Sequence, residues 1–163
     1  MSEMLGTLFK YLFAILGIGA VLGVMYSVVG DNKTANAVTQ VSQLAANVQQ
    51  LYAGQNNFTS VTNNALITAK AVPNGMWSGT ALITDPWAGA VTVSVNDNSA
   101  AMFDISMAGV PAGNCAKIST SITAYSQLTI NGGTVITPPA DAAAITSQCT
   151  STANTIVFTF SGS

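Results

Sequence analysis

The most marked feature of the sequence is a long apolar run near its beginning. Residues 11–29, YLFAILGIGAVLGVMYSVV, contain no charged side chain, and Lys10 and Asp31 flank the run. At about 1.5 Å per residue, a helix of this length crosses most of a hydrocarbon layer of roughly 30 Å. The alternative is a cleaved secretory signal. The apolar core of a signal is usually only ~7–15 residues long and is followed by a small-x-small cleavage site, which this chain lacks before Gly30-Asp31-Asn32. The pattern therefore favours a retained transmembrane anchor, with its N-terminus in the cytoplasm and the rest exported.

The helical pattern continues beyond this run, but on one face only. After Thr34 the apolar positions recur at intervals of three and four residues, as in an amphipathic helix. They are Val38, Val41, Leu44, Ala45, Val48, Leu51 and Tyr52. Gly54 then provides a stop signal, so we expect one helix from Ser2 to about Tyr52. Residues 1–30 would be its transmembrane half, and residues 31–163 an exported head that includes the amphipathic half.

Small residues lie along the apolar half of this helix. Gly19 and Gly23 have the four-residue spacing that lets two helix backbones approach closely, and Gly17 lies just before them. Each glycine also weakens a helix in water by about 1 kcal/mol. We therefore expect these three glycines to serve helix packing and to allow a local bend.

The remainder of the chain predicts a mixed α+β domain. Residues 55–89 contain frequent turn signals and are expected to be loop-like, with apolar side chains, Trp77 and Leu82 among them, that cover the helix stripe. Short apolar runs predict strands, and proline at a first position predicts a helix start. The expected strands are 90–95, 101–106, 127–130, 134–136 and 155–160, and the expected helices are 112–124 and 139–149. The exported part would thus be a helix packed on a small antiparallel sheet.

Charged residues are scarce, which narrows the classes of function. They make up 6 % of the chain, and the net charge is −2, whereas an ordinary soluble domain carries roughly 25 % charged residues. Binding of nucleic acid through phosphate contacts is therefore not expected. A surface of low charge repels its own copies only weakly, so the composition favours self-association over a secreted monomeric domain.

No group of residues indicates catalysis. The chain has no histidine, so the usual base at neutral pH is missing. The acidic residues of the exported part are scattered and suit structural roles, with Asp141 expected in the first turn of a helix; they are Asp85, Asp97, Asp104 and Asp141. We therefore expect no enzyme activity and no cofactor.

The two cysteines, Cys115 and Cys149, predict a disulfide, because an even number in an exported chain is typical of one. Two thiols without histidine or clustered carboxylates cannot complete a zinc site. The Cys-x-x-Cys spacing of a redox pair is also absent.

Four short motifs follow one another along the chain. They are LYAGQNNF at 51–58, AVPN at 71–74, DPWAG at 85–89, and Cys115-Ala116-Lys117 together with Cys149. Their order and spacing resemble the type IV pilins, specifically the type IVb class that includes the bundle-forming, toxin-coregulated and thin conjugative pilins. The resemblance implies the pilin fold, with Cys115–Cys149 as the family's disulfide. It also implies a major structural subunit that polymerises into an extracellular filament for adhesion, aggregation or conjugative mating contact.

The resemblance further implies a route of maturation and assembly. A prepilin peptidase removes a short leader, the new first residue is N-methylated, and the subunit waits in the inner membrane until the pilus assembly machinery extrudes it. No basic leader precedes Met1, so we take Met1 as the mature N-terminus and the candidate N-methyl residue. The apolar helix halves would then form the core of a helical homopolymer.

The charges near the N-terminus depart from the family pattern. The family usually has glutamate at the fifth mature position, where this chain has Leu5, and the acid is Glu3. An unpaired charge in an apolar core is costly, so our hypothesis is that Glu3 pairs with Lys10 or with the Met1 amine of an adjacent subunit. The alternative is that Glu3 caps the helix start.

The sequence also leaves other functions open. A minor pilin or a type II secretion pseudopilin shares the anchor but is incorporated in few copies. A membrane-anchored periplasmic binding module would never polymerise. A filamentous phage coat is a more distant alternative, since such coats are usually much shorter.

Overall fold

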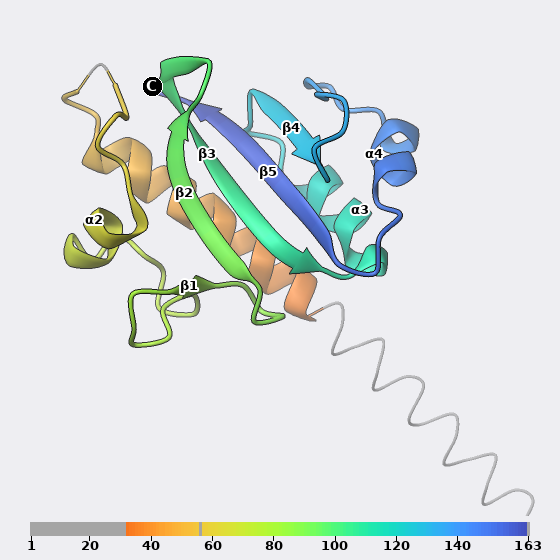
Figure 1. The fold of residues 1–163 in the computed structure, drawn as a ribbon, viewed down its shortest axis with the longest axis horizontal. Coiled ribbons are helices and arrows are strands. Elements are labelled where there is room, and N and C mark those ends of the chain that lie inside the picture. The colour runs from red at the N-terminus through yellow and green to blue at the C-terminus, as the bar shows by residue number, and fades with distance from the viewer. Residues whose placement is uncertain (1–31, 56, 163) are drawn as a thin grey trace, which may run out of the picture. The chain divides into compact units, whose positions relative to one another are not determined.

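The computed structural model describes residues 32–55 and 57–162, whose arrangement is shown in Figure 1. The predicted anchor at 11–29 lies outside these residues, and so do Met1, Glu3, Lys10, Gly17, Gly19 and Gly23. Of the helices that are described, none has both the length and the apolar character needed to cross a membrane.

The first described helix covers residues 32–51 and leads into a turn at 52–54. Its buried stripe has the predicted spacing of three and four, and consists of Ala37, Val41, Leu44, Ala45 and Val48. Val38 lies half-buried beside the stripe. Leu51, which we expected on the buried face, is 43 % exposed, whereas Tyr52 is buried. The amide of Gln55 donates to the carbonyl of Tyr52 over 2.9 Å and closes the turn.

The described residues form a five-stranded antiparallel sheet in the order β1-β2-β3-β5-β4. The strands are β1 (Ile83–Thr84), β2 (Ala90–Asn96), β3 (Ser99–Val110), β4 (Gln127–Ile130) and β5 (Asn154–Ser161). β5, the last strand in sequence, lies between β3 and β4. The end of the chain is therefore a central part of the fold rather than an addition at its edge.

Strand register decides which side chains enter the core. Phe103 of β3 pairs with Phe160 of β5, and Ile105 pairs with Phe158, so these four buried residues share the inner face. The 32–51 helix lies across this face (Figure 1). Helix and sheet thus bury each other's apolar side chains. Each large apolar side chain that is fully removed from water stabilises the fold by roughly 1.5–3 kcal/mol.

A run of aromatic rings crosses this core from the end of the helix to the start of β4. Neighbouring rings have centroids 4.8 to 6.4 Å apart, close enough to interact favourably. In spatial order the rings are Tyr52, Phe58, Phe103, Phe160, Phe158 and Tyr125. Helix, central strands and the far edge of the sheet therefore share one continuous core.

The segment 55–89 contains two short elements that the prediction of a loop missed. One is α2 (Asn63–Thr68), which begins after Thr62, whose hydroxyl accepts a hydrogen bond from the amide of Ala65 over 3.2 Å. The other is β1, which pairs with β2. Each is too short for a periodic pattern to recur along it, so its turn-forming neighbours dominate the sequence.

The C-terminal half follows the prediction in order but not in every boundary. The helices are α3 (Ala112–Ser121) and α4 (Ala142–Gln148), both shorter than expected. Asp141 lies before α4 and not in its first turn, because its carboxylate accepts a hydrogen bond from the amide of Ala143 as an N-cap. β3 extends to Val110, beyond the expected end at 106.

The strands expected at 127–130 and 134–136 meet each other at one position only. β4 pairs along its length with β5, and the expected strand at 134–136 contributes a single bridge, between Ile136 and Leu128. The partner of β4 comes from residues far along the chain, which local turn signals do not reveal.

A side chain covers part of the exposed edge of β2. Asn63 donates from Nδ2 to the carbonyl of Val91 and accepts at Oδ1 from the amide of Val93, each over 2.8 Å. It thereby satisfies the groups that a neighbouring strand would otherwise bind. This contact also joins α2 to the sheet.

The loop before β2 passes very close to β3 at Gly89, where an added Cβ would overlap the carbonyl oxygen of Ala108. Gly113 on α3 faces open space. We expect Gly89→Ala to lower the free energy of unfolding by roughly 1–3 kcal/mol. Gly113→Ala should keep it or raise it by up to about 1 kcal/mol, because alanine favours helix. Chemical denaturation of the purified chain, followed by tryptophan fluorescence, measures both; equal effects would contradict the close approach.

Candidate functional site

The acidic residues of the described chain are dispersed and have structural roles. Asp97 is exposed in the turn between β2 and β3. Asp104 accepts hydrogen bonds from Asn96 Nδ2 over 3.0 Å and from Thr159 Oγ1 over 2.6 Å on the outer face of the sheet. Within the described residues, no cluster of three or more His, Cys, Asp or Glu side chains could hold a metal ion.

Asp85 differs from the other acids in being only 4 % exposed. Its Oδ1 accepts from the amides of Trp87 and Gly89 over 2.9 and 2.8 Å, which shapes the loop before β2. Its Oδ2 is buried and has no hydrogen-bond partner among the described residues. Burial raises the pKa of Asp85, while the two amides and the charge of Lys33 act in the opposite direction.

The predicted disulfide is present. Cys115 on α3 and Cys149, directly after α4, are both buried, with their Cα atoms 5.8 Å apart. The bond closes a separation of 34 residues that includes β4 and α4. The bond therefore joins the end of α4 to α3. The other predicted site residues lie outside the described chain, so their roles stay predictions.

The side-chain amide of Asn154 is the centre of a buried hydrogen-bond network. Asn154 is fully buried, and its Nδ2 donates to the carbonyls of Val110 and Ser151 over 3.1 and 2.8 Å. Its Oδ1 accepts from Asn131 Nδ2 over 2.8 Å. Asn131 in turn accepts from the amide of Thr155 over 2.9 Å. The network joins the ends of β3, β4 and β5, and no local sequence pattern signals it.

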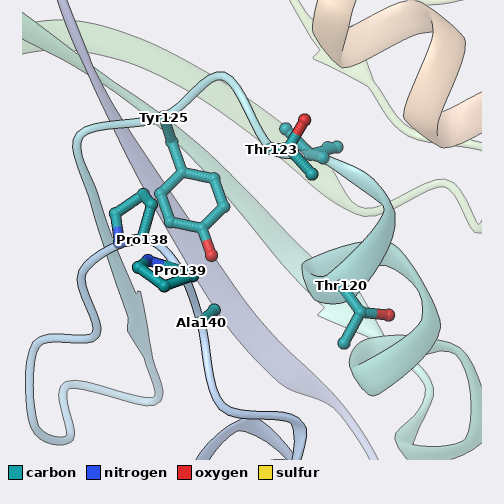
Figure 2. A pocket seen from close by; sticks show the side chains of 7 residues that line it. Thr120, Thr123, Tyr125, Pro138, Pro139 and Ala140 are labelled. Atoms are coloured by element: carbon teal, nitrogen blue, oxygen red, sulfur yellow. The ribbon is translucent and has the colours of Figure 1, made fainter.

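A hollow of about 510 Å³ opens between α3 and the segment before α4. It is lined mainly by Thr120, Thr123, Tyr125, Pro138, Pro139 and Ala140 (Figure 2). Tyr125 is only 5 % exposed, and burial raises the pKa of its hydroxyl, which points toward the centre of the group in Figure 2. We call this feature the Pro139 hollow.

Two large apolar side chains stand out at the opposite edge of the sheet. Trp77 is 52 % exposed and Leu82 is 60 % exposed, although we expected both to cover the helix. The indole nitrogen of Trp77 donates to the carbonyl of Thr80 over 2.9 Å. That bond restrains the ring within an exposed loop. Exposed tryptophan at a surface is typical of sites that bind another protein.

Comparisons with known proteins relate this chain to a protein family and to a known fold. Residues 31–161 match the protein family described as PilS N terminal. The fold is similar to the crystal structure of TcpA, a type IV pilin from Vibrio cholerae El Tor biotype, with a TM-score of 0.58. The identity is 18 %, over 80 % of this chain and 99 % of that chain, so this similarity concerns the fold alone. A search of curated protein sequences found no match.

Removal of the disulfide should weaken the head. We expect replacement of both Cys115 and Cys149 by serine to lower the free energy of unfolding by roughly 3–4 kcal/mol, the chain-entropy value for a loop of this length. Denaturation of the purified chain measures the loss, and addition of reductant to the unmodified chain is the matched control. A change below about 1 kcal/mol in both would contradict a structural role for the bond.

Asp85 should make stability depend on pH. The folded chain holds the Asp85 proton to higher pH than the unfolded chain, where the pKa is near 3.8. The contribution of Asp85 to the unfolding free energy therefore falls as pH rises from that value through the raised folded pKa. Asp85→Asn keeps the Oδ1 acceptor without the charge.

We expect Asp85→Asn to gain stability relative to the unmodified chain as pH rises from about 3 to about 7. Denaturation at a series of pH values measures the difference between the two proteins. Asp97→Asn, at an exposed turn, is the control and should not show this trend. A relative loss of stability with rising pH in Asp85→Asn would contradict the assignment.

Proposed function

We propose, on the premise that this chain belongs to the pilin family described as PilS N terminal and is a type IVb pilin, that its two parts divide the work of a filament. As a pilin, the chain is a structural subunit of an extracellular type IV pilus. In the proposal, residues 1–30 form the membrane anchor and later the filament core. Residues 31–163 form the head that makes the filament wall.

One observation carries this division. The helix over 32–51 has a single buried stripe, from Ala37 to Val48, and the head covers it. The run at 11–29 is apolar on all sides by sequence. A helix of that kind needs apolar surroundings on every face, which lipid or sister helices supply. The change in pattern along one predicted helix supports an anchor that exchanges lipid for copies of itself.

The same proposal covers the earlier steps in the life of the subunit. The subunit is held in the inner membrane, processed by a prepilin peptidase, and N-methylated at Met1. The assembly machinery then moves it into the filament, where Gly17, Gly19 and Gly23 allow close helix packing. The low charge of the chain supports dense packing of copies, since like-charge repulsion is small.

We also propose that the subunit has no catalytic activity and needs no cofactor. Pilins are structural proteins, and the dispersed roles of Asp85, Asp104 and Asp141 in this head support the same conclusion. No binding of nucleic acid by this subunit is expected, because its few cations form no basic face.

The test is the composition of filaments sheared from cells that produce the full chain. We expect this chain to be their principal protein, and Glu3→Ala to reduce the amount of sheared filament at least about tenfold, because Lys10 or the Met1 amine would lose its partner in the core. Glu3→Asp keeps the charge and is the control. Filament yield is measured by immunoblot and electron microscopy.

The outcomes separate two claims. Absence of filaments from the unmodified chain, or filaments without this protein, would contradict the proposed function. A normal yield from Glu3→Ala would contradict only the pairing of Glu3 in the core.

A further inference from the structure

The head carries two different surface features at opposite edges of its sheet. Trp77 forms a bridge with Ile83 of the edge strand β1. The Pro139 hollow lies near β4, the strand at the other edge. Figure 1 shows β1 and β4 on opposite sides of the head. The exposed indole and the hollow cannot meet within one subunit, but they can meet between two.

The surroundings of Trp77 form a coherent patch. Trp77, Lys70, Ile67 and Val72 line one hollow of about 360 Å³. Ile67 and Val72 are partly buried hydrophobic residues that pack against the core, and Lys70 is exposed. We call these four residues the Trp77 patch. It combines a large apolar side chain, apolar neighbours and one positive charge.

The Pro139 hollow offers complementary chemistry. Pro138, Pro139 and Ala140 provide apolar walls. Thr120 lines the side formed by α3, with its hydroxyl engaged by the carbonyl of Ala116 over 2.9 Å. Asp141 follows Ala140 directly and is exposed, with one carboxylate oxygen engaged as the cap of α4. The chain has only four cations and six anions, and one of each lies at these two surfaces, Lys70 at the Trp77 patch and Asp141 beside the Pro139 hollow.

We propose that the Trp77 patch of one subunit docks into the Pro139 hollow of the next, with Lys70 facing Asp141. This contact rests on the proposed function, in which copies of the chain form a filament. Two unlike patches at opposite edges make a heterologous contact. Repetition of such a contact gives a ring where the rotation closes and an open helical assembly where it does not, and the second outcome is the one that a filament needs. Tryptophan is enriched in the buried centres of protein interfaces, and polar and charged residues are found mainly at their rims.

Cysteine cross-linking tests whether the two patches meet. The full chain with Trp77→Cys and Pro139→Cys is expressed in cells, and its sheared filaments are oxidised and separated on a non-reducing gel. We expect a ladder of covalent multimers that reductant removes. Each single variant should give no ladder, and the control pair Trp77→Cys with Asp97→Cys should give none. Filaments in which the test pair stays monomeric, or in which the control pair forms an equal ladder, would overturn the contact.

Charge variants provide a second test that does not depend on the cysteine pair. Lys70→Asp places two carboxylates across the contact, and aspartate tolerates the left-handed backbone there, where φ is 56°. We expect about tenfold less sheared filament. Asp141→Asn preserves a cap for α4 and should restore most of the yield in the Lys70→Asp background, because it removes the repulsion.

Asp97→Asn in the Lys70→Asp background is the matched control and should restore nothing. A normal yield from Lys70→Asp, or equal rescue by both asparagine variants, would overturn the charge pairing and the docking with it. Filaments that assemble normally while these tests fail leave the pilin function intact. Absence of filaments from the unmodified chain would instead remove the function on which the contact depends.

Discussion

Burial of one helical stripe by one face of a sheet is the interaction on which the rest of the head depends. The helix over 32–51 has apolar side chains on a single face, and the inner residues of β3 and β5 cover them. The aromatic run from Tyr52 to Tyr125 extends this contact to the far edge of the sheet. Because the core is continuous, the exposed loop at one edge and the hollow at the other keep a defined separation.

Uncharged asparagine side chains join elements of this head that ion pairs join in many other proteins. Asn63 covers the edge of β2, and Asn154 joins the ends of three strands through hydrogen bonds to backbone and to Asn131. An amide both donates and accepts, so it satisfies buried backbone groups without adding charge. The head is thereby held together while its net charge stays small, a property suited to a subunit surrounded by copies of itself.

The disulfide and the asparagine network act on the same part of the molecule. The disulfide joins the end of α4 to α3, and Asn131 joins the end of α4 to the start of β5 through Gln148 and Asn154. The Pro139 hollow opens between α3 and the segment that leads into α4. A surface that has to fit a neighbour in every repeat of a filament benefits from such restraint, because any freedom it had before assembly would be lost on binding.

The sequence by itself determined the features whose signals are long or local. The spacing of the stripe through Val48, the strands β2 and β4, the Cys115–Cys149 pair and the family were all predicted from it. Tertiary structure alone decided the pairing of β4 with β5, the exposure of Trp77 and the burial of Asn154. These depend on contacts between residues far apart in the chain, as Asn154 with Val110 shows, and such contacts leave no local periodicity to read.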